Sequence, residues 1–137
     1  MKAKEYLMQI RKHEKIIESE LSQIKILRER AESITIGLNP DKVQSSTAND
    51  TIGDCVVKII MLENELKASV EESNRAIRGC LNVIKMTKPE HQQVLYKRYF
   101  ENETWETIAY EMHYTYQWVC VLHGRALIEV QQILDRN

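Results

Sequence analysis

The most reactive side chains of this sequence are those of its three cysteines and four histidines, and two of them, Cys120 and His123, lie one helical turn apart. A thiolate and an imidazole at that spacing would supply two ligands to a metal ion. Zinc requires more ligands, and His91 and His113 stand at no diagnostic spacing from the pair. Nucleophilic catalysis would need a third group to orient the imidazole, and the sequence indicates none. We therefore interpret the pair as a packed thiol and a surface imidazole, with no metal.

The sequence carries no motif of a known class of enzyme site. It has no glycine-rich phosphate loop, no His-Glu metal motif and no serine-centred elbow. Cys55, Cys80 and Cys120 are odd in number and widely spaced, which is typical of structural thiols rather than disulfides. We therefore predict that the protein is not an enzyme and that it binds no cofactor.

Residues 104–127, TWETIAYEMHYTYQWVCVLHGRAL, predict two helices joined by a tight turn. Thr104 can cap the first helix. A helix-turn-helix motif requires a small residue where its helices cross, and Ala109 stands at that position. His113 occupies the turn position that usually holds glycine, where histidine tolerates a left-handed backbone at modest cost. The side chains expected to fix the angle between the helices are those of Ile108, Met112, Tyr114, Val119 and Leu122.

Two long helices are expected before this motif. Residues 4–32 have a seam of side chains at alternating spacings of three and four, as in a coiled coil. Residues 54–85 repeat the spacing, and their first turns, VVKIIML, are apolar on nearly all sides, so one partner helix would not cover them. Residues 33–53 are predicted as a long loop, either a mobile tip or a functional segment. The seam positions of the first helix are Leu7, Ile10, Glu14, Ile17, Leu21, Ile24, Arg28 and Ala31.

The remaining segments complete an all-α fold. Residues 87–90, TKPE, are expected to begin a short helix that Thr87 caps and that runs to about Phe100. The last helix of the motif is expected over residues 116–135. We predict a long antiparallel helical hairpin over residues 1–86, which oligomerises, followed by a three-helix helix-turn-helix domain over residues 87–137. The expected assembly is a homodimer whose hairpins form a four-helix bundle, or a higher homo-oligomer.

The motif resembles a known family. TWETIAYEMHYTYQWVCVLHGRALIEV is similar to the fourth region of bacterial sigma factors, which ends in a helix with a similar Arg-Ala-Leu stretch. The preceding VLYKRYFENETW resembles the lead-in helix of that region. With its long N-terminal helices, the chain resembles the ArpU/RinA-type regulators of late-gene transcription from phages and prophages of Gram-positive bacteria. The resemblance implies a DNA-binding transcription regulator without catalytic activity, with RNA polymerase as a further partner.

The groove-facing positions of the second motif helix differ from those of sigma factors, which are rich in Arg, Glu and Gln. Gln117 can pair with adenine through two hydrogen bonds, and Val121 can contact a thymine methyl group. Tyr116 and Trp118 can reach sugar or phosphate through their OH and NH groups. Exposed Tyr and Trp are also typical of protein interfaces, which is the alternative for this surface. The nearby cationic candidates are Lys97, Arg98, His123 and Arg125.

The charge balance gives no general attraction to nucleic acid. The net charge is −1, and residues 89–137 hold four basic residues against seven acidic ones, whereas a DNA-binding domain is normally basic. Basic residues of the first helix, such as Lys4 and Arg11, either follow DNA beside the motif or form the solvated flank of a coiled coil. Their interleaved acids favour the flank. We expect two copies to bind double-stranded DNA together. The alternative is a protein-interaction or scaffold module, such as a phage packaging or assembly factor.

The sequence also predicts a cytoplasmic protein with no membrane partner. No apolar run approaches the roughly 18 residues that a membrane-spanning helix needs. The N-terminal residues, MKAKEYLMQIRKHEK, lack the apolar core of a signal peptide.

Overall fold

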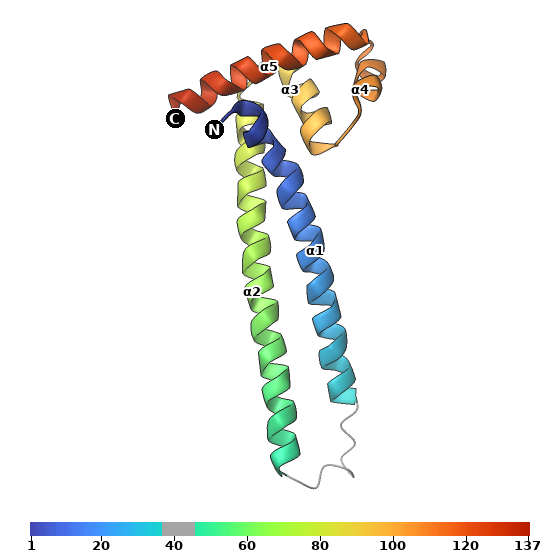
Figure 1. The fold of residues 1–137 in the computed structure, drawn as a ribbon, viewed down its shortest axis with the longest axis vertical. Helices are drawn as coiled ribbons and strands as arrows, with labels where there is room; N and C mark the ends of the chain where they lie inside the picture. Colours follow the sequence, from blue (N-terminus) through green and yellow to red (C-terminus); the bar gives the residue numbers. More distant parts are fainter. Residues whose placement is uncertain (37–45) are drawn as a thin grey trace. The chain divides into compact units, whose positions relative to one another are not determined.

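The computed structural model describes residues 1–36 and 46–137, and every regular element in these ranges is a helix (Figure 1). The predicted all-α class is therefore confirmed. No helix of the described residues is both long and apolar enough to cross a membrane. The elements are α1 (Ala3–Ile36), α2 (Ser46–Lys85), α3 (Pro89–Leu95), the π-helical turn η1 (Tyr96–Phe100), α4 (Trp105–Met112) and α5 (Tyr116–Arg136).

The predicted loop over residues 33–53 is too long at both ends. Helix α1 continues to Ile36, and α2 begins at Ser46 rather than near residue 54. The Ser, Thr and Asn residues of this segment lower helix propensity by only roughly 0.5 kcal/mol each relative to alanine, which does not prevent a long helix from extending. The rest of the predicted loop, residues 37–45, lies outside the described residues.

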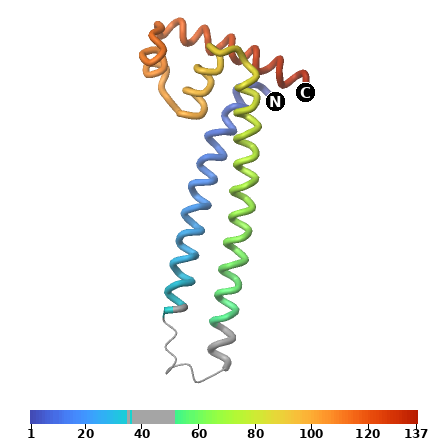
Figure 2. The backbone as a smooth tube through the Cα atoms, turned by 180° about the vertical axis from the view of Figure 1, so that it is seen from behind, coloured from blue at the N-terminus to red at the C-terminus, as the bar shows by residue number. Residues whose placement is uncertain are grey.

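The chain divides into two compact units: unit 1 comprises Met1–Lys15 and Asn74–Asn137, and unit 2 comprises Ile16–Ser73. Within unit 2, α1 and α2 lie side by side (Figure 2). Arg28 pairs with Glu63 at 3.0 Å, and the Ser69 hydroxyl donates to the Glu20 carboxylate at 2.5 Å. The earlier residue of α1, Glu20, contacts the later residue of α2, Ser69, and the later residue of α1, Arg28, contacts the earlier residue of α2, Glu63. The two segments are therefore antiparallel.

The predicted seam of α1 is correct only in part. Leu7, Ile10 and Ile24 are buried as expected, whereas Leu21 and Arg28 are exposed. In the later turns, Ile24, which is in register with Ile10, stays buried, whereas Leu21, which is in register with Leu7, is exposed.

Unit 1 contains both ends of the predicted hairpin together with α3, η1, α4 and α5. The Ala3 N–H donates to the Gln131 side chain at 2.8 Å, and the Cys80 thiol donates to the Tyr6 carbonyl at 3.3 Å. The prediction instead divided the chain between residues 86 and 87. The fully buried apolar side chains of this unit include Leu7, Ile10, Val94, Leu95, Ile108, Val119, Leu122 and Val130.

The start of α3 differs from the prediction. Lys88 is the residue before the first helical turn, and it makes no side-chain cap. The Thr87 hydroxyl donates instead to the Ile84 carbonyl at 2.6 Å, because Thr87 is buried against the end of α2. Pro89 begins the helix, at a position where its missing N–H costs nothing.

Candidate nucleic-acid interface

Helices α4 and α5 are joined by a turn whose hydrogen bonds are local. The Thr104 hydroxyl accepts from the Thr107 N–H at 3.2 Å, and the Thr115 hydroxyl accepts from the Trp118 N–H at 3.1 Å, so each helix begins with a side-chain cap. His113 ends α4 in the left-handed conformation, with φ 59° and ψ 38°. The predicted Thr104 cap and the predicted turn at His113 are confirmed.

The contact between α4 and α5 has a small apolar core. Ile108 and Val119 are fully buried, and Ala109 is buried where the helices approach each other. A larger side chain at Ala109 would push the axes apart. Met112 and Tyr114 pack against this core, as the sequence predicted for the helix contact, and Trp105 packs there as well.

The first turns of α5 present an exposed surface. Tyr116, Gln117, Trp118 and Val121 are exposed, as the prediction for a groove-facing surface requires. Residues 113–128 contain no acidic side chain. Because the N-terminus of a helix carries a partial positive charge, an exposed first turn without acids of its own favours the approach of an anion. The charges of Glu106 on α4 and Arg98 on η1 act on Tyr116 in opposite directions. The neighbouring Cys120 raises the pKa of the Tyr116 phenol above its ordinary value of 10. The phenol is protonated at neutral pH with or without this shift, so it can donate a hydrogen bond.

Arg125 lies on the same side of α5 as Trp118. Its guanidinium carbon lies 5.3 Å from the centroid of the Trp118 ring, within the range of a cation–π contact. Both residues line a groove of about 630 Å³ between α5 and the residues around the start of α3. Met86 and Ile128 line it as well, and both are exposed. The structure thus brings a cation and several apolar side chains together beside the first turns of α5.

His123 points away from this surface. Its Nε2 bonds the Tyr99 hydroxyl at 2.8 Å, and its ring packs against Trp105 with centroids 4.6 Å apart. Burial, and then the positive charges of Arg98 and Lys4, lower the pKa of His123 to about 4. The expectation of a surface imidazole is therefore wrong, and a neutral ring supports the packing of α5 at physiological pH. Cys120, expected to be packed, is exposed.

Lys97 and Arg98 come from η1 and make contacts within unit 1. The Lys97 ammonium pairs with Glu111, and this hydrogen bond raises the Lys97 pKa. The Arg98 guanidinium lies 4.2 Å from the centroid of Trp105 and donates to the Glu103 carbonyl at 3.0 Å. Neither cation is grouped with Arg125 beside the first turns of α5, so a role for either at DNA stays a prediction.

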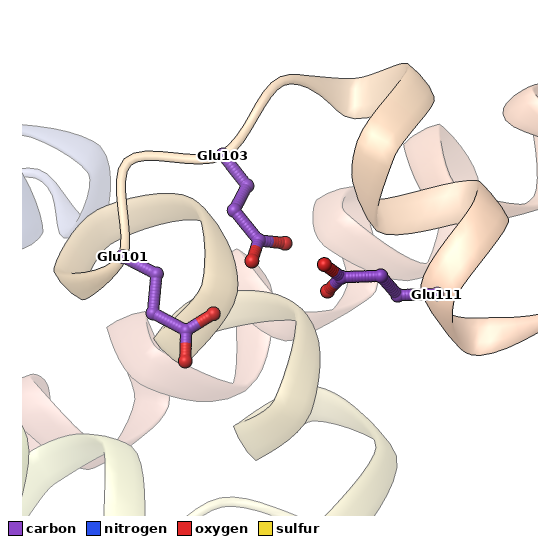
Figure 3. A group of neighbouring side chains, drawn as sticks. All are labelled: Glu101, Glu103 and Glu111. Carbon is purple, nitrogen blue, oxygen red and sulfur yellow. The ribbon is translucent and has the colours of Figure 1, made fainter.

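An acidic cluster surrounds Lys97. Glu101, Glu103 and Glu111 place their carboxylate oxygens within 4.8 Å of one another (Figure 3). Burial raises the pKa of Glu103 to about 7, and hydrogen bonds to Glu101 and Glu111 act in the same direction. Three carboxylates at this spacing can ligate a cation, but Lys97 already supplies positive charge to them. The Lys97 ammonium lies among the three carboxylates and partly balances their charge.

The groove beside α5 includes contacts that sequence reasoning missed. The His91 imidazole pairs with the Glu129 carboxylate, which also accepts from the Lys88 N–H at 3.1 Å. These bonds connect the start of α3 to the middle of α5. Residues separated by 38 positions show no periodic signal that would have revealed the pair.

No known protein family, curated protein or solved structure matches this chain. The resemblance to the fourth region of sigma factors therefore rests on the motifs between about residues 88 and 132. The family expectation stays a prediction, and the geometry of α4 and α5 carries the functional argument.

Proposed function

We propose that the protein is a sequence-specific, double-stranded DNA-binding transcription regulator of phage or prophage origin, with a sigma-like motif, and that it acts as an oligomer without catalytic activity. The observation that carries the proposal is the capped, acid-free and exposed start of α5, held on α4 by the buried residues Ile108, Ala109 and Val119. This combination is what a recognition helix requires in order to enter a major groove.

Base contacts in this proposal come from two exposed side chains. Gln117 pairs with adenine through two hydrogen bonds, and Val121 contacts a thymine methyl group. Tyr116 and Trp118 contact the sugar–phosphate backbone from the same turns, and Arg125 adds charge beside Trp118. The surface therefore combines A·T readout with few phosphate contacts.

Oligomerisation compensates for the small number of cations. Unit 2 leaves Val57, Ile60, Met61 and Leu62 about half exposed, and Ile26 on α1 is exposed as well. Apolar side chains of this number on one unit favour burial against a second copy. A dimer presents two recognition helices, and linking two weak sites raises the overall affinity by a factor of roughly 100 to 10,000.

Salt-dependent binding to duplexes from the upstream regions of neighbouring genes tests the proposal. The purified full chain should bind one such duplex selectively, and its affinity should fall as salt concentration rises. Gln117→Ala with Arg125→Ala should reduce the affinity by about 10-fold or more.

The matched control is Gln132→Ala with Arg136→Ala, which changes the same residue types in the C-terminal half of α5. This variant should retain the wild-type affinity for DNA. Absence of selective binding by a verified oligomer at low salt would contradict the proposal. Equal losses in the two double variants would show that the start of α5 is not the contact.

The alternative function is a protein-interaction or scaffold module, such as a phage packaging or assembly factor. The observation that favours it is the groove of about 630 Å³, in which Trp118, Met86 and Ile128 are exposed. In the N-terminal half of α5, Arg125 is the single cation. Aromatic and apolar side chains in a groove are typical anchors for a protein partner. Contact with RNA polymerase by the regulator would use the same kind of surface.

A further inference from the structure

Three cations of unit 1 that the proposed reading surface does not include converge on a small cavity. Lys4 and Arg11 come from the first turns of α1, and Arg98 comes from η1. The three side chains line a cavity of about 110 Å³, together with Met8, Tyr99 and Trp105. The sequence favoured a solvated coiled-coil flank for Lys4 and Arg11, but both residues lie beside the motif because α1 begins within unit 1.

The two guanidinium groups donate to neutral acceptors, in the segment that also carries Glu101 and Glu103. Arg11 Nε donates to the Asn102 side-chain carbonyl at 2.8 Å, and Arg98 donates to the Glu103 backbone carbonyl at 3.0 Å. Both acceptors are neutral. Among the described residues that line the cavity, none is acidic.

His123 responds to the positive field of this cluster. The ring packs against Trp105 and Tyr99, which form part of the cavity wall. After burial, the charges of Arg98 and Lys4 are the causes that hold its pKa down at about 4.

We propose that Lys4, Arg11 and Arg98 form a binding site for a phosphate group. A cavity of 110 Å³ has room for about three to four waters at roughly 30 Å³ each, or for one phosphate group in their place. Arginine donates to phosphate oxygens through its planar fork, and lysine adds a point charge. The bonds to Asn102 and Glu103 hold the two guanidinium groups in place, so fewer side-chain conformations are lost when the anion binds.

The phosphate group has two possible sources, a nucleic-acid backbone or a free phosphate compound. The first source rests on the proposed DNA-binding function, because the cavity adjoins Trp105, at the start of α4. A backbone phosphate there would add to the phosphate contacts of α5. The second source is independent of that function.

The first arm of the test uses inorganic phosphate and the fluorescence of Trp105. In a Trp118→Phe background, Trp105 is the single tryptophan of the chain, which has two. Sodium phosphate, compared with sodium chloride at equal ionic strength, should produce a saturable change in fluorescence. Lys4→Gln with Arg11→Gln should weaken this binding at least 10-fold. Lys12→Gln with Lys15→Gln removes the same charge from exposed positions of the same helix and should leave binding unchanged.

The second arm measures DNA affinity as a function of salt, with Trp118 retained. Each phosphate contact contributes roughly 0.9 to the slope of log affinity against log salt concentration. The Lys4→Gln, Arg11→Gln variant should therefore have a slope smaller by about 1 than the wild type, and the Lys12→Gln, Lys15→Gln variant should not.

The two arms separate the sources and the two proposals. Saturable phosphate binding without a change in salt slope identifies a free phosphate compound, and this holds even if the protein binds no DNA. A change in slope without binding of free phosphate identifies the nucleic-acid backbone. If Lys4→Gln with Arg11→Gln alters neither measurement relative to the wild type, or if the control variant alters them equally, the site does not exist.

Discussion

Units 1 and 2 bury their apolar side chains to very different extents, although both are built from amphipathic helices. In unit 1, Leu7, Val94, Ile108 and Val119 are fully buried. Among the side chains of unit 2 that the structure describes, the buried apolar one is that of Ile24, whereas a series of large apolar side chains is about half exposed on α2. The comparison shows that unit 1 has a core of its own, whereas the two antiparallel helix segments of unit 2 leave apolar surface exposed. This is the surface that the proposed oligomer would bury.

The largest expected effect on stability lies in the core of unit 1. Ile108→Ala should lower the free energy of unfolding by about 2–5 kcal/mol, because the side chain is fully buried between α4 and α5. Ile60→Ala, at an exposed position of unit 2, should change the stability of the monomer by less than about 0.5 kcal/mol. Urea denaturation at low protein concentration measures both. A similar loss of unfolding free energy in the two variants would contradict the difference in burial between the two units.

The next effect concerns assembly through unit 2. Met61→Glu with Leu62→Glu places two charges on its exposed apolar surface, and should convert the oligomer to a monomer in sedimentation experiments. The DNA affinity of the full chain should then fall by roughly 100-fold, because two linked sites become one. Asn74→Glu with Gln93→Glu adds the same charge at exposed polar positions and should leave the oligomer intact. A double variant of unit 2 that remains oligomeric would place the interface elsewhere.

A smaller effect should appear in the dependence of stability on pH. The pKa of His123 is about 4 in the folded chain, below its ordinary value of 6.5, because the ring is half-buried beside two cations. Protonation therefore favours the unfolded chain, so the contribution of His123 is present above pH 6.5 and is lost as the pH falls through about 4. The loss should be about 2 kcal/mol, since water screens the exposed part of the ring. NMR titration of the imidazole measures the pKa, and a value near 6.5 would show that His123 is not packed against Tyr99 and Trp105.

The smallest effect concerns the start of α5. Thr115→Ala removes the acceptor of the Trp118 N–H and should cost about 1 kcal/mol, with no change in the fold of unit 1. Ser22→Ala, at an exposed position within α1 in unit 2, is the control and should not destabilise the chain, because alanine has a higher helix propensity by roughly 0.5 kcal/mol. Thermal unfolding followed by circular dichroism measures both. An equal effect of the two changes would mean that the cap does not define the first turn of α5.

The parts of the molecule that could be predicted from the sequence are those determined by local contacts. Thr104 and His113 act on residues three or four positions away, and the spacing of Ile108 and Val119 follows from the helical repeat. The groups that were missed depend on contacts between distant segments. Arg11 lies 91 positions from its partner Asn102, and no local pattern places it beside the motif.

The corrected positions of the candidate site have the same cause. His123 was expected at the surface and is packed, whereas Cys120 was expected to be packed and is exposed. Both lie near the boundary of the α5 apolar face. The burial of His123 depends on Tyr99 and Trp105, which belong to other elements. The uneven burial of the α1 seam, with Ile24 buried and Leu21 exposed, does not follow from the spacing of the apolar residues alone.

Selection of bound sequences from a random pool of duplexes tests the central claim most directly, because it requires no prior choice of target. The account predicts enrichment of one motif made of two half-sites, and loss of the preference for adenine at one position of each half-site when Gln117 is replaced by alanine. Enrichment of no motif by the oligomeric protein, or an unchanged motif for Gln117→Ala, would contradict the claim that the start of α5 reads DNA.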